Sequence, residues 1–409
     1  MLWKYRAAAI VLIIFAMYFF LPKPLRLVDQ TPVWYINAPV NGSPDILNAT
    51  LGFQQVFVIN LPARTDRRDA MTLATALTNI DVTWIDGVSG DEISDKVLPA
   101  DSSGKAISKG NKGSWRAHMN ALQKVVHQNM TSALILEDDA DWDVRLKSQL
   151  QVFAQAARAF SQPSTANAGK SLSEGNYYAS TTHQQDLPLT QIPPITHPTL
   201  TSYGDNWDVL WLGHCGTDFP QPTNDANTNT PSHSPPPLRI TIPNDATVPE
   251  PQHLKPHPFA LQDPLATIYP PHTRVVHAAS GTTCTQAYAV SQRGARKLLW
   301  QFGLQTFTTG WDLMLGKWCD GQYMTSTEAE LASRPLKRPV CVTVQPPLFS
   351  HHYGKGAASD ITSPGGGFID KEKEMTPYVR LSVRLNMERL VGGAGLEELV
   401  DQWPDETMV

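Results

Sequence analysis

Charged residues are scarce in this sequence, and several familiar motifs are missing from it. Asp, Glu, Lys and Arg make up 17% of the 409 residues, with a net charge of −5, whereas about 25% is typical of soluble domains. No basic stripe is present, which argues against nucleic acid as a partner. A P-loop, a Gly-x-Gly-x-x-Gly turn and a Gly-x-Ser-x-Gly elbow are also absent, so enzyme classes that depend on those motifs are excluded.

Cysteine is rare as well. The four cysteines are Cys215, Cys284, Cys319 and Cys341. Their spacing is too wide for a zinc motif, so we expect one or two disulfides instead. The sequence does not choose among the alternative pairings.

The amino terminus predicts a cytosolic tail and an uncleaved signal anchor over residues 1–28. Residues 7–21 carry no charge and are mostly apolar, and basic residues flank them on both sides. A cleaved signal peptide is the alternative, but Pro22-Lys23-Pro24 stands where a small-residue cleavage site should lie. We therefore expect a single-pass type II protein of the Golgi or ER membrane, with residues 29–50 as a stem and the rest of the chain in the lumen.

Strand and helix patterns alternate through residues 55–160. The expected elements are strands at 55–61, 81–88 and 132–136 and helices at 69–77, 114–128 and 145–160. Such alternation predicts an α/β fold with a mostly parallel sheet flanked by helices.

The main domain is expected over residues 51–361, with proline-rich insertions near 161–205 and 216–272. These two stretches have few apolar runs, so they cannot bury enough surface to offset the entropy of ordering, and we expect long disordered loops. Residues 362–409 are expected to form a C-terminal tail with a helix at about 378–390.

The most informative stretch is a short apolar strand that ends in three adjacent acids, Glu137, Asp138 and Asp139. Ligands of open α/β sheets bind outside the carboxyl ends of the strands. Three carboxylates so close together are unfavourable unless a cation or hydrogen-bond donors compensate them. Mg²⁺ or Mn²⁺, held by oxygen ligands and binding a substrate phosphate, would do so. A solvated acidic loop is the simpler alternative.

Other candidate residues lie before and after this strand. Asp312 precedes a helical segment, and His351 and His352 follow a late strand. With the acids, these groups suit transfer from a diphosphate-activated donor, because a metal offsets charge on the departing diphosphate and a carboxylate accepts the proton of the attacking hydroxyl. Each also has a structural alternative, since Asp312 could serve only as a helix N-terminal charge and the histidines as a surface pair.

Three motifs in the right order carry a family resemblance. They are Val58-Ile59-Asn60-Leu61 with the following Arg64, Asp66, Arg67 and Arg68, then Leu134-Ile135-Leu136-Glu137-Asp138-Asp139, and then residues 286–291 (QAYAVS) with 294–299 (GARKLL). They resemble the motifs of glycosyltransferase family 25, which includes lipooligosaccharide and procollagen galactosyltransferases. One motif departs from the family, because residues 113–118 (GSWRAH) keep only the glycine and the histidine of Gly-Cys-x-x-Ser-His.

The resemblance implies a membrane-anchored eukaryotic member with a GT-A type fold. It also implies a UDP-sugar donor, often UDP-galactose, a glycan or glycoprotein acceptor, inversion at the anomeric carbon, and Mn²⁺ or Mg²⁺ as cofactor. The site residues that it implies are Asp312 and His118 for catalysis, Asn60, Arg64, Arg67, Glu137 and Asp138 for the nucleotide sugar, and Glu137, Asp139 and His351 for the metal. For His118 a structural role in the core is the alternative. Two other functions stay open, a catalytically inactive binding module and a metal-dependent phosphohydrolase.

Overall fold

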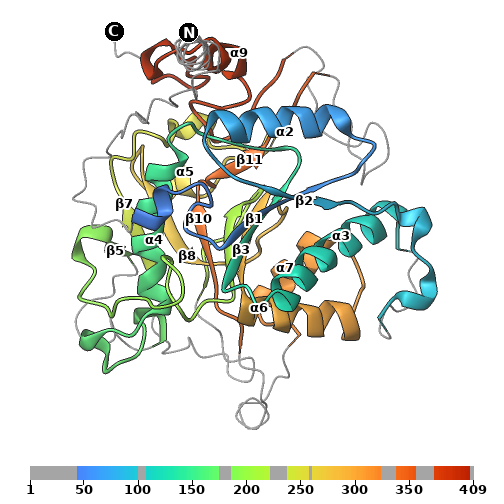
Figure 1. Ribbon diagram of the computed structural model, residues 1–409. Helices are drawn as coiled ribbons and strands as arrows, with labels where there is room; N and C mark the ends of the chain where they lie inside the picture. The colour runs from blue at the N-terminus through green and yellow to red at the C-terminus, as the bar shows by residue number, and fades with distance from the viewer. Residues whose placement is uncertain are drawn as a thin grey trace, which may run out of the picture. The chain divides into compact units, whose positions relative to one another are not determined.

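The structure is a computed structural model that describes residues 44–99, 107–174, 186–221, 237–257, 260–323, 338–355 and 373–405. The predicted signal anchor and most of the predicted stem lie outside these residues. Of the helices that are described, none has the length and apolar character needed to span a bilayer. The described residues form a mixed α/β fold around one large sheet (Figure 1).

Eleven strands within the described ranges belong to that sheet. They are β1 (Gln55–Asn60), β2 (Thr83–Asp86), β3 (Ser132–Glu137), β4 (Ala140–Trp142), β5 (Asp186–Pro188), β6 (Val209–Gly213), β7 (Arg239–Ile242), β8 (Arg274–Ala278), β9 (Ala287–Ser291), β10 (Cys341–Gln345) and β11 (Phe349–His351). The main path runs β2-β1-β3-β9-β6-β10-β8-β7-β5, and β11 pairs with β4 and β6 beside it.

The sheet is mixed, so the prediction of a mostly parallel sheet holds for β1, β2 and β3 but not for the sheet as a whole. β1 pairs in parallel with both β2 and β3, as the alternating pattern predicts. β9, however, lies antiparallel between β3 and β6, and β8 is antiparallel to both β7 and β10. The physical reason is that a strand buried on both faces is apolar throughout and looks the same in either direction.

Helices cover both faces of the sheet, because alternate side chains of its strands point to opposite sides. One face carries α2 (Thr65–Leu77) and α4 (Leu146–Ser161). The other carries α3 (Lys109–His127), α6 (Gln292–Leu298) with its π-helical continuation to Gln305, and α7 (Trp311–Cys319). In Figure 1, α3, α6 and α7 gather on the opposite side from α4. The helix predicted from Ser114 begins earlier, because the hydroxyl of Ser108 caps the Asn111 N–H.

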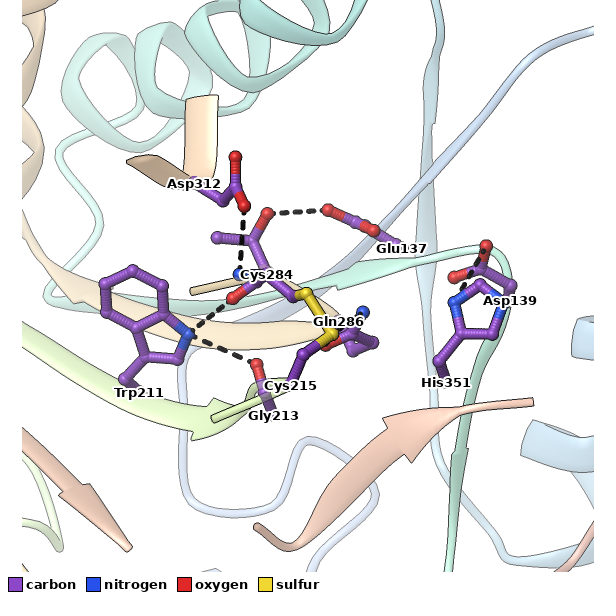
Figure 2. Close-up of a disulfide and its surroundings, with 10 residues drawn as sticks. Glu137, Asp139, Trp211, Gly213, Cys215, Cys284, Gln286, Asp312 and His351 are labelled. Atoms are coloured by element: carbon purple, nitrogen blue, oxygen red, sulfur yellow. Dashed lines mark hydrogen bonds and ion pairs between the residues drawn. A yellow bond between two sulfur atoms is a disulfide. The ribbon is translucent and has the colours of Figure 1, made fainter. Parts of the chain in front are cut away.

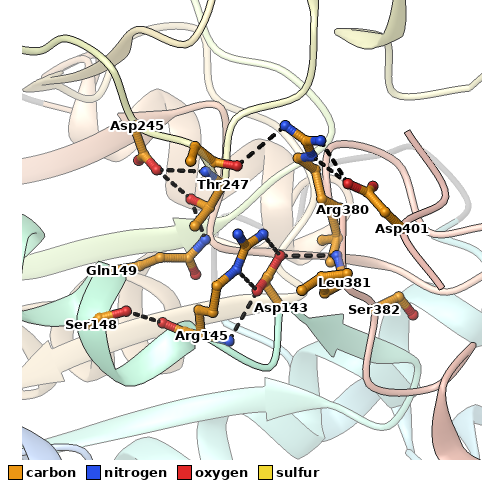
Figure 3. Close-up of polar contacts among 12 residues, drawn as sticks. Asp143, Arg145, Ser148, Gln149, Asp245, Thr247, Arg380, Leu381, Ser382 and Asp401 are labelled. Carbon is orange, nitrogen blue, oxygen red and sulfur yellow. Dashed lines mark hydrogen bonds and ion pairs between the residues drawn. The ribbon is translucent and has the colours of Figure 1, made fainter. Parts of the chain in front are cut away.

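The two proline-rich insertions are ordered in their described parts, contrary to the expectation of disordered loops. They contribute β5, β7 and the short helix α5 (Leu265–Ile268), and the two strands form one edge of the sheet. A fully buried ion pair between Arg274 Nε and Asp245 Oδ2, 2.6 Å long, joins the loop after β7 to the first residue of β8. Thr247 accepts a hydrogen bond from Gln149 of α4 (Figure 3). Buried polar contacts therefore help to stabilise these segments, in which apolar residues are sparse.

The C-terminal residues 373–405 pack against the core rather than forming the predicted helix of residues 378–390. Within this segment the structure has the short helix α9 (Met387–Val391) and a 3-10 turn at Leu396–Glu398. The N–H of Val144 donates to the carbonyl of Leu381, and the N–H of Val383 donates to that of Trp142, both at 3.0 Å. Figure 3 shows Leu381 donating to Asp143 at the start of α4. Pairing with the chain around β4 takes the backbone groups that a helix would have used.

Two disulfides settle the pairing that the sequence left open. Cys215 is bonded to Cys284, and Cys319 is bonded to Cys341. The first joins the residues just after β6 to those just before β9. The second joins the last residue of α7 to the first residue of β10.

Candidate active site

The three acids lie on the wall of a cavity at the carboxyl ends of β1 and β3. Because these neighbouring strands are parallel, with Ile59 opposite Glu137, the residues that end them meet at one edge of the sheet. The cavity has a volume of about 630 Å³. Its lining includes Arg67, His118, Glu137, Asp138 and Asp139, together with the loop of residues 87–92 after β2. Five of the predicted site residues thus share one cavity.

Asp138 is held inside the turn by two neighbours. Its Oδ2 accepts a hydrogen bond of 2.8 Å from Asn60 Nδ2, and its Oδ1 accepts one of 2.7 Å from Arg67 Nη1. Burial, together with the charge of Asp139, raises the pKa of Asp138 above its usual range despite Arg67. Arg67 also pairs with Asp139 Oδ2 at 2.9 Å. Two of the three acids therefore have a cationic partner before any ligand arrives.

The two carboxylate oxygens of Asp139 have different surroundings. Its Oδ1 is buried and accepts no hydrogen bond from the residues that the structure describes. The imidazole of His351 lies 3.7 Å from the other oxygen, Oδ2. Burial would raise the pKa of Asp139, but His351, Arg67 and Arg384 together hold that pKa below its usual range. A buried, ionised oxygen without a partner, next to an imidazole, fits a divalent cation.

Glu137 faces a different direction from Asp139. Its Oε1 accepts a hydrogen bond of 2.6 Å from Thr285 Oγ1 and lies 3.7 Å from His118 Nε2. Figure 2 shows Glu137 turned toward the chain at Cys284, while Asp139 and His351 face each other apart from it. The predicted metal set is therefore divided, with Asp139 and His351 together and Glu137 apart.

A three-residue group with suitable metal-binding atoms does occur elsewhere in the described chain. Glu250, His272 and Asp405 bring one such atom each within 4.8 Å of one another. Arg380 already pairs with Asp405, at 2.9 Å. This group lies on segments that do not line the cavity of the acids.

His118 is almost fully buried in α3, yet it lines the cavity. Its ring stacks on Trp311 with centroids 5.1 Å apart, and its Nδ1 is hydrogen-bonded to the Tyr288 hydroxyl at 2.9 Å. The other nitrogen, Nε2, faces Glu137. Tyr288 thus fixes the ring so that one nitrogen points to the acid.

Asp312 lies in the first turn of α7 and is not part of the cavity lining. Its Oδ2 accepts a hydrogen bond of 3.0 Å from the backbone N–H of Cys284 (Figure 2). Arg64 also lies outside the lining. Its guanidinium pairs with Asp66 at 2.7 Å and, as the largest influence, lowers the pKa of Asp66 to about 2.

Sequence reasoning missed several residues that shape this site. Thr285 and Tyr288 lie next to or within the strand predicted at 286–291, but nothing in the pattern pointed to their hydroxyls. Arg384 donates to the carbonyls of Asp138 and Ala140, at 2.7 and 3.1 Å, from a stretch that was predicted to be a tail. The aromatic ring of Tyr353 packs on His351 with centroids 4.3 Å apart.

We expect Asp141→Ala to destabilise the protein by about 3 kcal/mol, because it leaves several buried donors unsatisfied. The Asp141 carboxylate is fully buried and accepts hydrogen bonds from the hydroxyls of Thr376 and Ser382 and from the N–H of Trp142. Urea unfolding of the variant measures the loss. Asp86→Ala is the control, because the Asp86 side chain is 75% exposed, and a change below about 0.5 kcal/mol is expected there. Equal effects of both substitutions would contradict the prediction.

The cavity lies at the ends of parallel strands and is lined by carboxylates, an imidazole and a guanidinium, and part of this chain is similar to glycosyltransferases. Residues 53–193 match the family described as Glycosyltransferase family 25 (LPS biosynthesis protein). This match over part of the chain confirms the resemblance to glycosyltransferase family 25 that the three sequence motifs predict.

This chain is similar to curated relatives whose names give an activity and to others whose names include the word inactive. It is 28% identical over 170 residues to Procollagen galactosyltransferase 1 of Danio rerio, a match that covers 35% of this chain and 28% of the relative. It is also 28% identical over 148 residues to the Probable inactive glycosyltransferase 25 family member 3 of Bos taurus, covering 34% of this chain and 24% of the relative. The match therefore spans about a quarter of the length of these relatives.

Proposed function

We propose that this chain is a metal-dependent inverting glycosyltransferase that moves a sugar from a UDP-sugar to a hydroxyl of a glycan or glycoprotein. The observation that carries the proposal is the buried Oδ1 of Asp139, which has no hydrogen-bond partner among the described residues and belongs to a residue that lines the cavity and lies beside His351. The names of the procollagen galactosyltransferase relatives favour galactose as the sugar. The parallel β1, β2 and β3 with acids after β3 support a GT-A type arrangement.

Asp139 and His351 would hold Mn²⁺ or Mg²⁺. The ion, when bound, would neutralise the charge that develops on the departing diphosphate. Arg67 lies on the same wall and adds a second positive charge toward that diphosphate. Asn60 donates to Asp138 and thereby holds the turn in place, while Arg64, which pairs with Asp66 at the start of α2, would contact the nucleotide from outside the cavity.

Glu137 and His118 would bind the donor on the other side of the cavity. Their facing atoms are 3.7 Å apart, and Tyr288 and Thr285 fix their orientation. Asp312 would accept the proton of the acceptor hydroxyl, because inversion requires a base on the face opposite the leaving group. Water is kept from its neighbourhood by Trp311 and Tyr288, which are both buried.

A catalytically inactive binding module is the second candidate. Arg67 already pairs with Asp138 and Asp139, which a scaffold that binds no metal would require. Residues 113–118 also depart from the family motif, and some relatives carry the word inactive in their names. The resemblance to the family therefore does not distinguish an active enzyme from an inactive binding module, and an experiment is needed to separate the two.

The decisive experiment is a calorimetric titration of the purified full chain with UDP, with and without Mn²⁺. We expect Mn²⁺ to raise the affinity for UDP by about tenfold or more. A screen of UDP-sugars follows, with sugar transfer and donor hydrolysis as the two readouts. Binding of UDP without either reaction would favour the inactive module, and binding of neither UDP nor Mn²⁺ would refute the enzymatic proposal. Release of phosphate without any transfer would favour a phosphohydrolase.

Membrane attachment through residues 7–21 and a place in the Golgi or ER remain part of the proposal. The two disulfides support a luminal domain, because disulfides form in oxidising compartments. Protease protection of the domain in sealed microsomes would test this topology.

A further inference from the structure

A two-residue segment, Cys284-Thr285, contacts both carboxylates that the proposed mechanism places around the donor. The N–H of Cys284 donates to Asp312 Oδ2 at 3.0 Å, and the hydroxyl of Thr285 donates to Glu137 Oε1 at 2.6 Å. Figure 2 shows that the two acids approach this segment from different elements, because Glu137 lies at the end of β3 and Asp312 lies in α7. Among the described residues, no other segment donates to both carboxylates.

The segment is itself anchored from its other side. Cys284 is bonded to Cys215, and its carbonyl accepts a hydrogen bond of 2.9 Å from Trp211 Nε1. The carbonyl of Gln286, the next residue, accepts the N–H of Glu137 at 3.0 Å. The disulfide and the indole come from β6 and the turn after it, and the carbonyl of Gln286 connects to β3. Three independent attachments thus fix a short piece of chain.

The backbone of Cys284 is in the left-handed region, with φ of 63°. For a residue with a side chain this conformation is unfavourable by about 1–2 kcal/mol and persists only where the surroundings over-determine it. The conformation turns the Cys284 N–H toward α7 while the Thr285 hydroxyl reaches β3. Such strain is typical of positions where the orientation of a functional group depends on the backbone.

We propose that Thr285 and the Cys284 amide are positioning groups for Glu137 and Asp312, and that the Cys215–Cys284 disulfide holds them in place. The inference rests on the proposed function, because the two carboxylates have their roles there. Thr285 sets the orientation of the donor-binding acid, and the Cys284 amide sets that of the base. Neither touches the donor, so both act through another side chain.

The first test replaces Thr285 with Val, which keeps the shape and removes the hydroxyl. Losing a hydrogen bond to a carboxylate is expected to raise the KM for the UDP-sugar about tenfold, while kcat changes by less than about threefold. Thr285→Ser, which restores the hydroxyl, should return KM to within about twofold of the parent. If Thr285 acted only in packing, Thr285→Val should keep the parental KM and Thr285→Ser should raise it, because Ser lacks the methyl group that Val retains.

The second test breaks the disulfide with the double substitution Cys215→Ala and Cys284→Ala. Freeing the segment should lower kcat about tenfold or more as well as raise KM, because Asp312 also loses its fixed partner. The matched control breaks the other disulfide with Cys319→Ala and Cys341→Ala, assayed below the melting temperature of each variant. The control should change kcat and KM by less than about threefold.

A third readout does not depend on activity. Amide hydrogen exchange in the peptide 282–286 should become faster in the Cys215/Cys284 variant and in Asp312→Ala, and should stay slow in the Cys319/Cys341 control. If the parent shows no UDP binding but this exchange pattern holds, the proposed function fails and the positioning contacts stand. If the parent transfers sugar but Thr285→Val and Ser behave alike, or exchange is unchanged on breaking the first disulfide, the inference is overturned.

Discussion

Asp139→Asn is expected to lower the rate of sugar transfer by about 1000-fold in the presence of saturating Mn²⁺. The substitution keeps the size of the side chain and removes the negative charge. The lost charge belongs to the one carboxylate on the cavity wall, among the described residues, with a buried oxygen that accepts no hydrogen bond. Without that charge, Arg67 and Arg384 would oppose a cation at the same place.

Initial rates over a series of Mn²⁺ concentrations measure this effect. The variant should need a much higher Mn²⁺ concentration for half-maximal rate, and calorimetry should show weaker UDP binding with Mn²⁺ but similar binding without it. Asp81→Asn is the control, because Asp81 is an exposed acid on the same domain. Transfer by Asp139→Asn at the parental rate, with the same dependence on Mn²⁺, would remove the basis of the proposed metal site.

Asp312→Asn is expected to reduce kcat by about 100- to 10,000-fold, with UDP binding unchanged. The amide oxygen of Asn can still accept the hydrogen bond from Cys284, so the backbone contact is kept while the base is lost. A loss confined to kcat would separate this residue from Glu137 and His118, for which we expect weaker donor binding.

Single-turnover transfer with the enzyme in excess over the donor isolates the chemical step of this variant. Asp320→Asn is the matched control, because Asp320 is the C-cap residue at the other end of α7 and its carboxylate accepts a hydrogen bond from the backbone N–H of Gly281. A kcat within about threefold of the parent for Asp312→Asn would assign the base to another residue. The Glu137 carboxylate, which faces His118, would then be the next candidate.

The parts of the site that follow strands could be predicted from the sequence. The apolar residues of β3 followed by acids, and β1 followed by polar residues, are local patterns, and parallel pairing places their ends together. The pairing of Asp138 with Asn60 and Arg67 follows from the same adjacency. The resemblance to glycosyltransferase family 25 could also be predicted, because it depends on short motifs in a fixed order.

The direction in which Glu137 points could not be predicted. Adjacent residues at the end of a strand alternate in direction only while the chain stays extended, and the chain turns between Glu137 and β4. Whether three neighbouring acids meet at one cation therefore depends on the turn and its partners. Those partners, Thr285 and Arg384, lie far along the chain in stretches without a distinctive pattern.

The same limitation explains the errors in the fold. The parts of the proline-rich insertions that were expected to be loops are held by a buried Arg274–Asp245 pair and by contacts with Gln149, which no local composition signals. Residues 378–386 have apolar spacing that suits a helix, but their backbone groups are taken by residues 141–144. Long-range hydrogen bonds override local preference in both cases.

The dependence of the acidic turn on residues 376–384 has a consequence for biosynthesis. Asp141 shares hydrogen bonds with Thr376 and Ser382, which follow it by 235 and 241 residues. At an elongation speed of about 5–20 residues per second, the ribosome needs on the order of 10–50 seconds to reach them. During this interval Asp141 lacks the two hydroxyl donors that it has in the folded protein, so chaperone binding to the emerging domain should persist until translation has passed Arg384.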